Sequence, residues 1–284
     1  MRPMYAAANS ALRVAPWLRP SVEKLAWRIF YEVVSLRQDE HTTRLVGGGF
    51  NYGFAASDEI TPGEGETQFG LALYAAVVGA ADVSGGDVIE VGCGRGEGSA
   101  FVFERYGPRS LTGVDIARSA IKRCRRRHGR PGLTFATGDA ENLSFPSASV
   151  DAVINVESSH CYPRMARFLR EVLRVLRPGG LLLFADFRPT SSSPSEAVPK
   201  DDLAELRRQL AETGLRTLDE QDITAEVVRA LSLATPAVRA HIENRVPRPL
   251  RHDAIEYSGV EGSARFREFA DGSLTYLKLV LEKA

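Results

Sequence analysis

The residues that most clearly point to chemistry are four closely spaced glycines, Gly92, Gly94, Gly96 and Gly98, directly after a run of branched apolar residues. A glycine loop between a strand and a helix lets a ligand approach the backbone closely. Dinucleotide-binding enzymes seat a pyrophosphate on such a loop, but their G-x-G-x-x-G pattern would need a glycine where this chain has Glu97. A carboxylate at a helix N-terminus would also repel a pyrophosphate. The loop therefore favours a ligand without phosphates.

The segments around this loop alternate between buried-strand and helical patterns. Strands are predicted at 87–92, 110–116, 133–140, 150–156 and 181–187, and helices at 97–106, 117–129 and 164–177. The Pro-Gly-Gly at 178–180 is expected to break the last helix before the fifth strand. Because parallel strands need crossover connections, this order predicts an α/β fold with a doubly wound parallel sheet. Such sheets bind ligands at the carboxyl ends of their strands, where the glycine loop lies.

Further elements are expected on both sides of this alternation. The segment 21–38 has apolar residues at helical spacing. A helix capped by Asp201 or Asp202 should end at Gly214, the stretch from 224 to about 251 reads as helical and interrupted by prolines, and 273–284 reads as a last strand.

Composition limits the possible partners. The chain has 284 residues, and its 36 basic and 36 acidic side chains leave no net charge to attract nucleic acid or an anionic membrane. Its three cysteines form neither a CxxC pair nor a zinc-type cluster. No stretch reaches the roughly 18 apolar residues of a membrane span, and the N-terminus lacks the apolar core of a signal peptide. We expect a reduced, cytoplasmic protein with no metal site.

Five motifs in order carry a family resemblance. They are EVGCGRG from Glu90, GVDI ending the second strand, GDAENL after the third, VINVESSHCY at the fourth, and EVLRVLRPGGLLLFADF leading into the fifth. Together they resemble class I S-adenosylmethionine-dependent methyltransferases. The resemblance implies a Rossmann-like, mostly parallel seven-stranded sheet with helical lid additions at both ends of the chain. It divides the chain into an N-terminal helical segment and lid, 1–66, and a methyltransferase domain, 67–284, with a substrate-covering insertion at about 224–272.

The resemblance also implies cofactor-binding residues, with S-adenosylhomocysteine as the product. Asp115 would accept hydrogen bonds from both ribose hydroxyls. Asp139 would bind the adenine amino group, and the backbone of Ala140 an adenine ring nitrogen. The other positions implied for the cofactor are Tyr52, Glu90, Gly92, Gly94, Gly96, Ile116, Glu141 and Asn155.

A narrower resemblance joins NYGF, NVESSHCYP, LRPGG and ADFRP to methyltransferases of natural-product pathways. These act on mycobacterial phthiotriolone lipids, microcystin-type peptides and rifamycin-type macrocycles. The resemblance implies a lipophilic small-molecule substrate in secondary-metabolite or antibiotic biosynthesis, methylated at a hydroxyl oxygen.

Transfer to a hydroxyl is faster when a base takes the proton as the bond forms. Histidine alone titrates near neutral pH without perturbation, so His160 is the candidate base, and Glu157 could orient its ring or act as the base itself. Phe50, Tyr52 and Tyr162 could line the path of the cationic methyl with aromatic faces.

Alternatives remain open. Carbon methylation of a prenyl chain or alkene would also use Glu157 or His160, to remove a proton afterwards. The basic run at 122–130 would suit RNA, so RNA or protein methylation is a second alternative, although such runs are more often solvated helix ends and we expect no nucleic-acid partner. A catalytically silent binding protein is disfavoured by the intact motifs. The aromatic residues of the segment 21–38 need burial, either in their own subunit or in a homo-oligomer.

Overall fold

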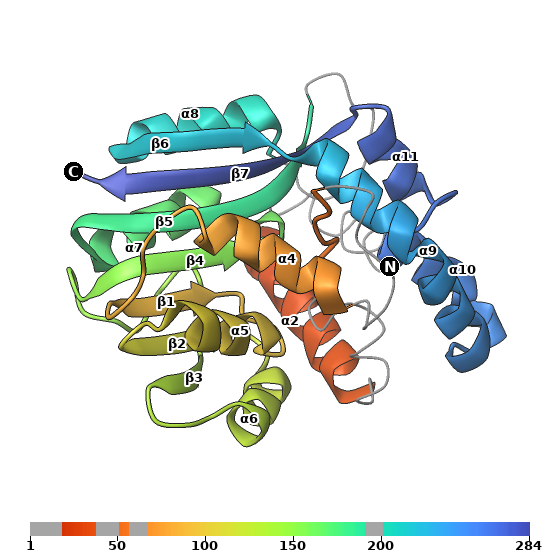
Figure 1. Cartoon of the computed structure of the whole chain (residues 1–284), viewed down its shortest axis with the longest axis horizontal. Coiled ribbons are helices and arrows are strands. Elements are labelled where there is room, and N and C mark those ends of the chain that lie inside the picture. The colour runs from red at the N-terminus through yellow and green to blue at the C-terminus, as the bar shows by residue number, and fades with distance from the viewer. Residues whose placement is uncertain (1–18, 38–50, 57–66, 191–200) are drawn as a thin grey trace.

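A seven-stranded sheet forms the centre of the computed structural model, which describes residues 19–37, 51–56, 67–190 and 201–284 (Figure 1). Its strands are β1 (Asp87–Val91), β2 (Ser110–Asp115), β3 (Leu133–Thr137), β4 (Val150–Val156), β5 (Leu176–Pro189), β6 (Leu215–Asp222) and β7 (Leu274–Lys283). They pair in the order β3-β2-β1-β4-β5-β7-β6. The first five are parallel to their neighbours, and β7 runs antiparallel to both β5 and β6. The predicted mostly parallel, seven-stranded α/β fold is confirmed.

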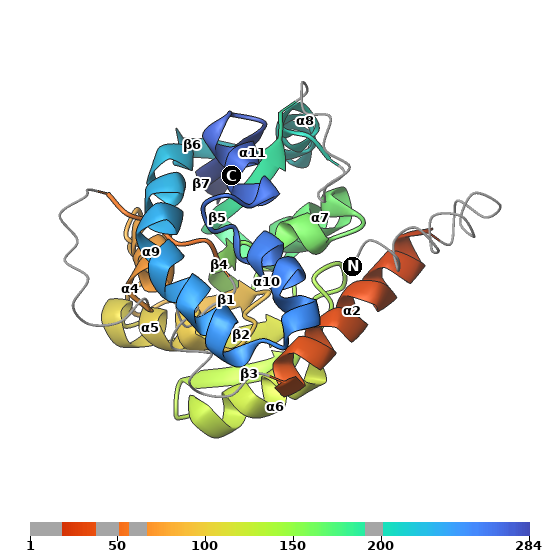
Figure 2. The same cartoon turned by 90° about the vertical axis from the view of Figure 1, so that its right-hand side faces the viewer.

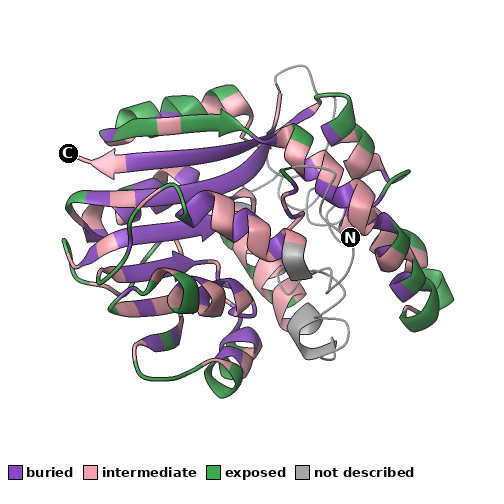
Figure 3. Cartoon of the chain, in the orientation of Figure 1, coloured by how far each residue is buried: buried purple, intermediate pink, exposed green. Residues whose placement is uncertain are grey.

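Helices cover both faces of the sheet because successive strand residues point to opposite sides. Val88 belongs to one hydrophobic cluster with α4 (Thr67–Val78), α5 (Glu97–Tyr106) and α6 (Arg118–Arg127). Its neighbour Ile89 belongs to a second cluster with α7 (Met165–Val175) and α8 (Leu203–Thr213). The inner strands are accordingly buried along most of their length (Figure 3).

The predicted helix ends are set by glycines and one aspartate. Gly96 and Gly107 flank α5 with φ of 81° and 60°, a left-handed conformation that favours glycine. Asp202 caps α8 by accepting a hydrogen bond from the Glu205 amide at 2.8 Å, and Gly214 ends it with φ 80°. The expected cap and stop of this helix are confirmed.

Three elements differ from the sequence-based expectation. The fifth strand begins at Leu176, ahead of the Pro-Gly-Gly, because Leu176 already pairs with Val150 before a register shift in the ladder. Pro236 lies inside a continuous helix, α9 (Thr224–Arg245), so the interruption comes only after Arg245. The edge strand β6 was not predicted, because most of its side chains are exposed on both faces and show no alternating pattern.

The remaining helices gather at the carboxyl ends of the parallel strands (Figures 1 and 2). They are α2 (Arg19–Arg37), the short η2 (Ser159–Cys161), α9, the short η3 (Arg248–Leu250), α10 (Arg251–Ser258) and α11 (Ala264–Ala270). Strand order reverses between β1 and β4, and in open α/β sheets the crevice outside such a reversal is where ligands bind. None of the helices in the described ranges is long and apolar enough to cross a membrane.

Candidate active site

A cavity opens at this reversal, between the strand ends and α2. It spans about 1030 Å³ of empty space, including its open mouth. Its wall combines Lys24, Trp27, Tyr31, Asn51, Tyr74 and Ala120 with the segments 91–95, 97–98, 114–117, 138–141, 156–158 and 161–163. The loops after β1, β2, β3 and β4 therefore meet around one space.

Nine of the predicted site residues line this cavity: Gly92, Gly94, Asp115, Ile116, Asp139, Ala140, Glu141, Glu157 and Tyr162. Phe50 lies outside the described residues. The cavity wall does not include the predicted residues Tyr52, Glu90, Gly96, Asn155 and His160.

The glycine loop is held tightly against its neighbours. The amides of Gly92 and Cys93 donate to the Val114 carbonyl at 2.8 and 3.0 Å. Gly92 has φ 81°, and a Cβ there would overlap the Ser158 side chain. A larger residue would therefore push the loop away from the residues that follow β4.

Asp115, at the end of β2, faces the same loop. Its Oδ2 accepts a hydrogen bond from the Gly94 amide at 2.9 Å, and its Oδ1 accepts one from the Ala117 amide at 2.8 Å. Removal from water raises the pKa of this carboxyl to about 6, although the two amides oppose the shift. The backbone fixes its orientation and leaves further lone pairs for a ligand.

Lys24 of α2 reaches the carboxylates after β3, a contact that the sequence gave no reason to expect. Its Nζ lies 2.8 Å from Asp139 Oδ2 and 2.7 Å from Glu141 Oε2. Farther along α2, Glu32 accepts hydrogen bonds from the Arg118 and Ser119 amides at the start of α6, at 2.8 and 3.0 Å. The helix is thus anchored across the cavity at two places.

Three predicted residues have structural partners behind the cavity wall. The Glu90 carboxylate accepts hydrogen bonds from the hydroxyls of Tyr74 and Ser99, so it ties β1 to the helices beneath. Asn155 donates to the Val91 carbonyl at 2.9 Å. A Cβ at Gly96 would lie 2.8 Å from Phe135, on the side away from the cavity wall.

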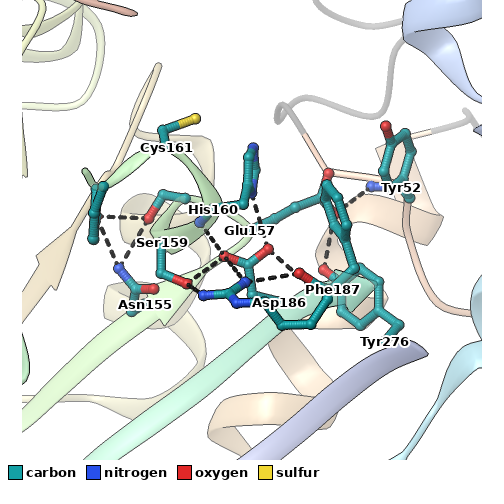
Figure 4. Close-up of polar contacts among 12 residues, drawn as sticks. Tyr52, Asn155, Glu157, Ser159, His160, Cys161, Asp186, Phe187 and Tyr276 are labelled. Carbon is teal, nitrogen blue, oxygen red and sulfur yellow. Dashed lines mark hydrogen bonds and ion pairs between the residues drawn. The ribbon is translucent and has the colours of Figure 1, made fainter. Parts of the chain in front are cut away.

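His160, which follows β4, pairs with the fully buried Asp186 near the end of β5 (Figure 4). His160 Nδ1 lies 2.9 Å from Asp186 Oδ1. The other oxygen, Oδ2, accepts hydrogen bonds from the Ser159 hydroxyl at 2.6 Å and the His160 amide at 2.9 Å. Arg188 completes the group, with Nη1 3.5 Å from Asp186 Oδ2. Because these contacts and the Phe187 amide hold the carboxylate in place, it fixes the ring orientation of His160.

These contacts shift the pKa values of both His160 and Asp186. Burial alone would lower the pKa of His160, but Cys161 and Asp186 favour its charged form and raise the pKa to about 10. Burial alone would raise the pKa of Asp186, but His160 and Arg188 hold it well below its usual range. The expectation that His160 titrates near neutral pH without perturbation is therefore wrong.

Glu157 lies beside this pair but is held differently. Its Oε2 accepts hydrogen bonds from the Tyr52 amide and the Tyr276 hydroxyl, both at 2.8 Å (Figure 4). Burial outweighs these donors and the nearby His160, and raises the pKa to about 8. Its φ of 47° is uncommon for a residue with a side chain, and such strain often accompanies functional sites. Glu157 is thus mostly a neutral acid in the cavity wall at neutral pH.

Aromatic side chains surround His160. The Phe187 ring centroid lies 4.7 Å away, and Trp27 of α2 packs edge-on at 6.4 Å. The predicted cofactor residue Tyr52 instead packs its ring at an angle against Phe187 and edge-on against Phe269, with centroids 5.7 and 5.4 Å apart. The histidine therefore sits in a largely apolar, aromatic setting next to the cavity.

Sequence reasoning missed Asp186, Tyr276 and Lys24. Asp186 was visible in the motif ADF at the end of the fifth strand, where a strand order that places β5 beside β4 brings it to His160. Tyr276 and Lys24 carry no comparable local signal. No group of three or more His, Cys, Asp or Glu side chains in the described ranges is arranged to hold a metal ion.

Known proteins resemble this chain in sequence. Residues 89–184 match the family model described as a methyltransferase domain. A phthiotriol/phenolphthiotriol dimycocerosates methyltransferase of Mycobacterium tuberculosis is 34% identical over 256 residues, covering 90% of this chain and 91% of the relative. A fatty-acid O-methyltransferase of Mycolicibacterium smegmatis is 36% identical over 264 residues, covering 93% and 92%.

Solved structures share the fold at lower identity. The cyclase SpnF superposes with a TM-score of 0.72 at 20% identity, covering 92% of this chain and 96% of that one. A geranyl diphosphate C-methyltransferase from Streptomyces coelicolor A3(2), solved with S-adenosyl-L-homocysteine, gives 0.69 at 16% identity, covering 92% and 98%. At these identities the likeness concerns the fold.

Proposed function

The chain belongs to the methyltransferase family, and we propose that it transfers the methyl group of S-adenosylmethionine to a hydroxyl oxygen of a lipid-like small molecule. The observation that carries the oxygen assignment is the His160–Asp186 pair beside the cavity at the strand ends. The relatives named for phthiotriol lipids and for fatty-acid O-methylation support an apolar acceptor from specialised lipid or secondary metabolism.

The cavity wall fits a nucleoside cofactor without phosphates. Asp115 after β2 and Asp139 after β3 present carboxylate acceptors, which suit ribose hydroxyls and an adenine amino group. Glu97, the first residue of α5, adds a carboxylate that would repel a pyrophosphate. When bound, S-adenosylmethionine supplies an electrophilic methyl carbon on a positively charged sulfur.

The His160–Asp186 pair can accept a proton once the His160 ring is neutral. Asp186 accepts the Nδ1 hydrogen, so the neutral ring has its acceptor lone pair on Nε2. If the acceptor oxygen attacks the methyl carbon while the methyl–sulfur bond breaks and S-adenosylhomocysteine leaves, the hydroxyl proton would pass to Nε2, and Asp186 would stabilise the imidazolium that results. A positive charge in the adjacent cavity would lower the high pKa of His160 and favour the neutral form that must start the reaction.

The surroundings keep water from the reacting groups. Trp27 and Tyr31 of α2 line the cavity, and Phe187 packs on the His160 ring. An in-line displacement needs its reactants held close together, with no competing solvent. The acceptor would then lie between His160 and the cavity, under α2.

The decisive experiment compares His160→Gln with Glu157→Gln in a transfer assay with isotopically labelled methyl and a panel of fatty acids, fatty alcohols and phenolic lipids. We expect His160→Gln to lower kcat by about a hundredfold or more and to leave S-adenosylhomocysteine affinity unchanged by calorimetry. Glu157→Gln should retain most of the rate of O-methylation. Unchanged kcat in His160→Gln would refute the proposed base.

Carbon methylation is the second candidate, favoured by Glu157. Its side chain lies in the cavity wall as a buried, mostly neutral carboxyl group. After transfer to an alkene, such a group in its ionised form could take a proton from the neighbouring carbon. If this chemistry operates, Glu157→Gln loses the larger part of kcat, and the product carries the labelled methyl on carbon.

A further inference from the structure

A row of hydrogen-bonding side chains runs from His160 toward the surface. The Cys161 side chain hydrogen-bonds to the His160 ring, and its Sγ lies 3.4 Å from the Tyr31 hydroxyl. The Tyr31 hydroxyl also hydrogen-bonds to Tyr257. Because Asp186 occupies Nδ1, the ring nitrogen left for Cys161 is Nε2, and Figure 4 shows Cys161 on the side of the ring away from Asp186. The row therefore begins at the nitrogen that would take the proton of the acceptor.

This row connects a shielded base to solvent. The side chain of His160 is 12% exposed, whereas Tyr257 at the other end of the row is 39% exposed. Between them, Cys161 and Tyr31 line the cavity. Cys161 belongs to η2, Tyr31 to α2 and Tyr257 to α10. The row therefore forms only where α2 and α10 cover the ends of the strands.

The other neighbours of the His160 ring offer no route for a proton. Phe187 and Trp27 cover the ring with aromatic groups, which do not accept protons. On the Nδ1 side, Asp186 and Arg188 are 0% and 1% exposed, and a guanidinium keeps its proton in proteins. The row through Cys161 thus gives the ring a connection to solvent that these neighbours do not.

A proton route matters because each transfer to a hydroxyl would leave a proton on His160. The pKa of His160 is raised to about 10, so at neutral pH the ring keeps that proton unless a partner removes it. Glu157, in the adjacent cavity wall, is itself mostly protonated at neutral pH and is a poor acceptor. The base would have to lose its proton before the next acceptor hydroxyl could react.

We propose that Cys161, Tyr31 and Tyr257 form a proton relay that returns His160 to its neutral form after each methyl transfer. The inference rests on the proposed function, which makes His160 the base. Once the product has left, the Nε2 proton passes to Cys161 Sγ while the thiol passes its own proton to the Tyr31 oxygen. Tyr31 passes a proton to Tyr257 in the same way, and Tyr257 releases one to solvent. Each relay residue gains one proton and loses one, and none of them has to touch the acceptor.

The test separates the first turnover from later ones. The full chain is incubated with S-adenosylmethionine carrying a labelled methyl group and then mixed with a fatty alcohol or phenolic lipid, in dilute buffer at neutral pH. We expect Cys161→Ala to complete its first turnover at the wild-type rate and then to lower the steady-state rate by about tenfold or more, the loss of an assisted proton transfer. Tyr31→Phe should do the same. High concentrations of imidazole, a small diffusible proton carrier, should restore the steady-state rate of both variants.

Two variants serve as matched controls. Cys161→Ser should keep the wild-type steady-state rate, because a hydroxyl both accepts and donates a proton. Tyr106→Phe also removes a tyrosine hydroxyl, one that donates to the Ala75 carbonyl away from the row, and should change neither phase. Calorimetry with S-adenosylhomocysteine should give the wild-type affinity for every variant, as evidence that the site is folded.

Wild-type turnover by Cys161→Ala in dilute buffer would overturn the relay. A first turnover slowed as much as the later ones would also overturn it, because Cys161 would then support the chemical step itself. If His160→Gln is inactive while Cys161→Ala turns over normally, only the relay falls. If the wild type transfers no methyl group, or His160→Gln keeps the wild-type rate, the proposed function falls and the relay falls with it.

Discussion

Three carboxyl groups toward the carboxyl ends of β2, β4 and β5 are kept in three different protonation states by their partners. Asp186 stays ionised because a histidine and an arginine face it. Glu157 is mostly neutral because one amide donor and one hydroxyl donor do not offset its burial, which raises its pKa to about 8. Asp115 lies between these extremes, with a pKa of about 6. Separated pKa values among neighbouring groups are typical of sites that divide acid, base and binding roles.

The ionised state of Asp186 can be tested through the pH dependence of the rate. Since the pKa of His160 is raised to about 10, the neutral base becomes more abundant as pH rises, and kcat/KM should increase on the alkaline side of neutrality. Asp186→Asn removes the charge that supports the imidazolium. We expect kcat to fall by about a hundredfold or more and the basic limb of the profile to move to lower pH.

Ser159→Ala is the control for this variant, because it removes one hydrogen bond from Asp186 and keeps the charge. Its pH profile should coincide with that of the wild type. If Asp186→Asn still binds S-adenosylhomocysteine and the basic limb of its pH profile does not move, Asp186 does not set the pKa of His160.

Glu157 should make the protein less stable as pH rises. Its carboxyl keeps its proton in the folded state up to about pH 8, whereas an unfolded glutamate loses it near an ordinary pKa of about 4.3. Between these values the folded state binds more protons, so the free energy of unfolding falls with increasing pH. Glu157→Gln can accept the same hydrogen bonds from Tyr52 and Tyr276 without this loss.

Denaturant titrations of both proteins across that range measure the effect. The stability of Glu157→Gln relative to wild type should increase with pH and level off above about pH 8. Glu104→Gln should track the wild type, because Glu104 is exposed. Parallel curves for Glu157→Gln and wild type would mean that the carboxyl is already ionised at low pH.

Among single residues, the sequence predicted the functional side chains that follow strands. It missed the side chains that distant elements bring to those strand ends. His160, Glu157 and Asp115 lie in recognisable strand motifs, and eight of the thirteen predicted cofactor and catalytic positions line the cavity. Lys24 comes from a helix more than 100 residues away from its partners, so only packing of the whole chain brings it to the site.

Among the helices, α2 contributes the most residues to the cavity wall: Lys24, Trp27 and Tyr31. Lys24 binds Asp139 and Glu141, and Glu32 caps α6. Partly exposed ion pairs and caps of this kind contribute about 1 kcal/mol each. The double variant Lys24→Met, Glu32→Gln should therefore release α2 while the sheet remains folded.

Hydrogen exchange measures that release. Amides of α2 should exchange at least about tenfold faster in the double variant, with the β4 and β5 amides unchanged. Transfer activity should fall as well, because Trp27 and Tyr31 line the cavity. Arg208→Met, which breaks exposed ion pairs on α8, is the control. Equal exchange of α2 in both variants would show that its aromatic contacts alone hold it.

The elements that the sequence predicted best have strong periodic patterns and clear ends. Helix α5 matches its predicted range because glycines bound it, whereas β6 was missed because an exposed edge strand buries too little to show alternation. The basic run at 122–130 lies largely on the exposed side of α6 and beyond its end, with Arg130 paired to Glu104. This arrangement supports the interpretation of a solvated helix end.

In the molecule as a whole, other parts of the same chain cover the aromatic side chains of α2. The Phe30 ring packs against Tyr257 of α10 at 5.8 Å, and the Tyr31 hydroxyl lies 3.4 Å from Cys161 Sγ. The burial that motivated a homo-oligomer is thus supplied within one subunit, and the oligomer stays a prediction. The outward face of α2 retains Leu25 and Ile29, which are 54% and 50% exposed, as the surface that such an oligomer would use.

The same covering arrangement predicts how a ligand should stabilise the molecule. The cavity wall joins α2 to loops after four strands, so a ligand that contacts all of them should tie the N-terminal helix to the sheet. S-adenosylhomocysteine at a hundred times its dissociation constant should add about 2.7 kcal/mol and raise the unfolding temperature by roughly 5 °C or more. Exchange should slow in α2 and in the glycine loop, whereas β6, at the far edge of the sheet, should change only as much as global stability requires. Protection of β6 equal to that of α2 would show that the ligand stabilises the fold as a whole and leaves α2 no more firmly held than before.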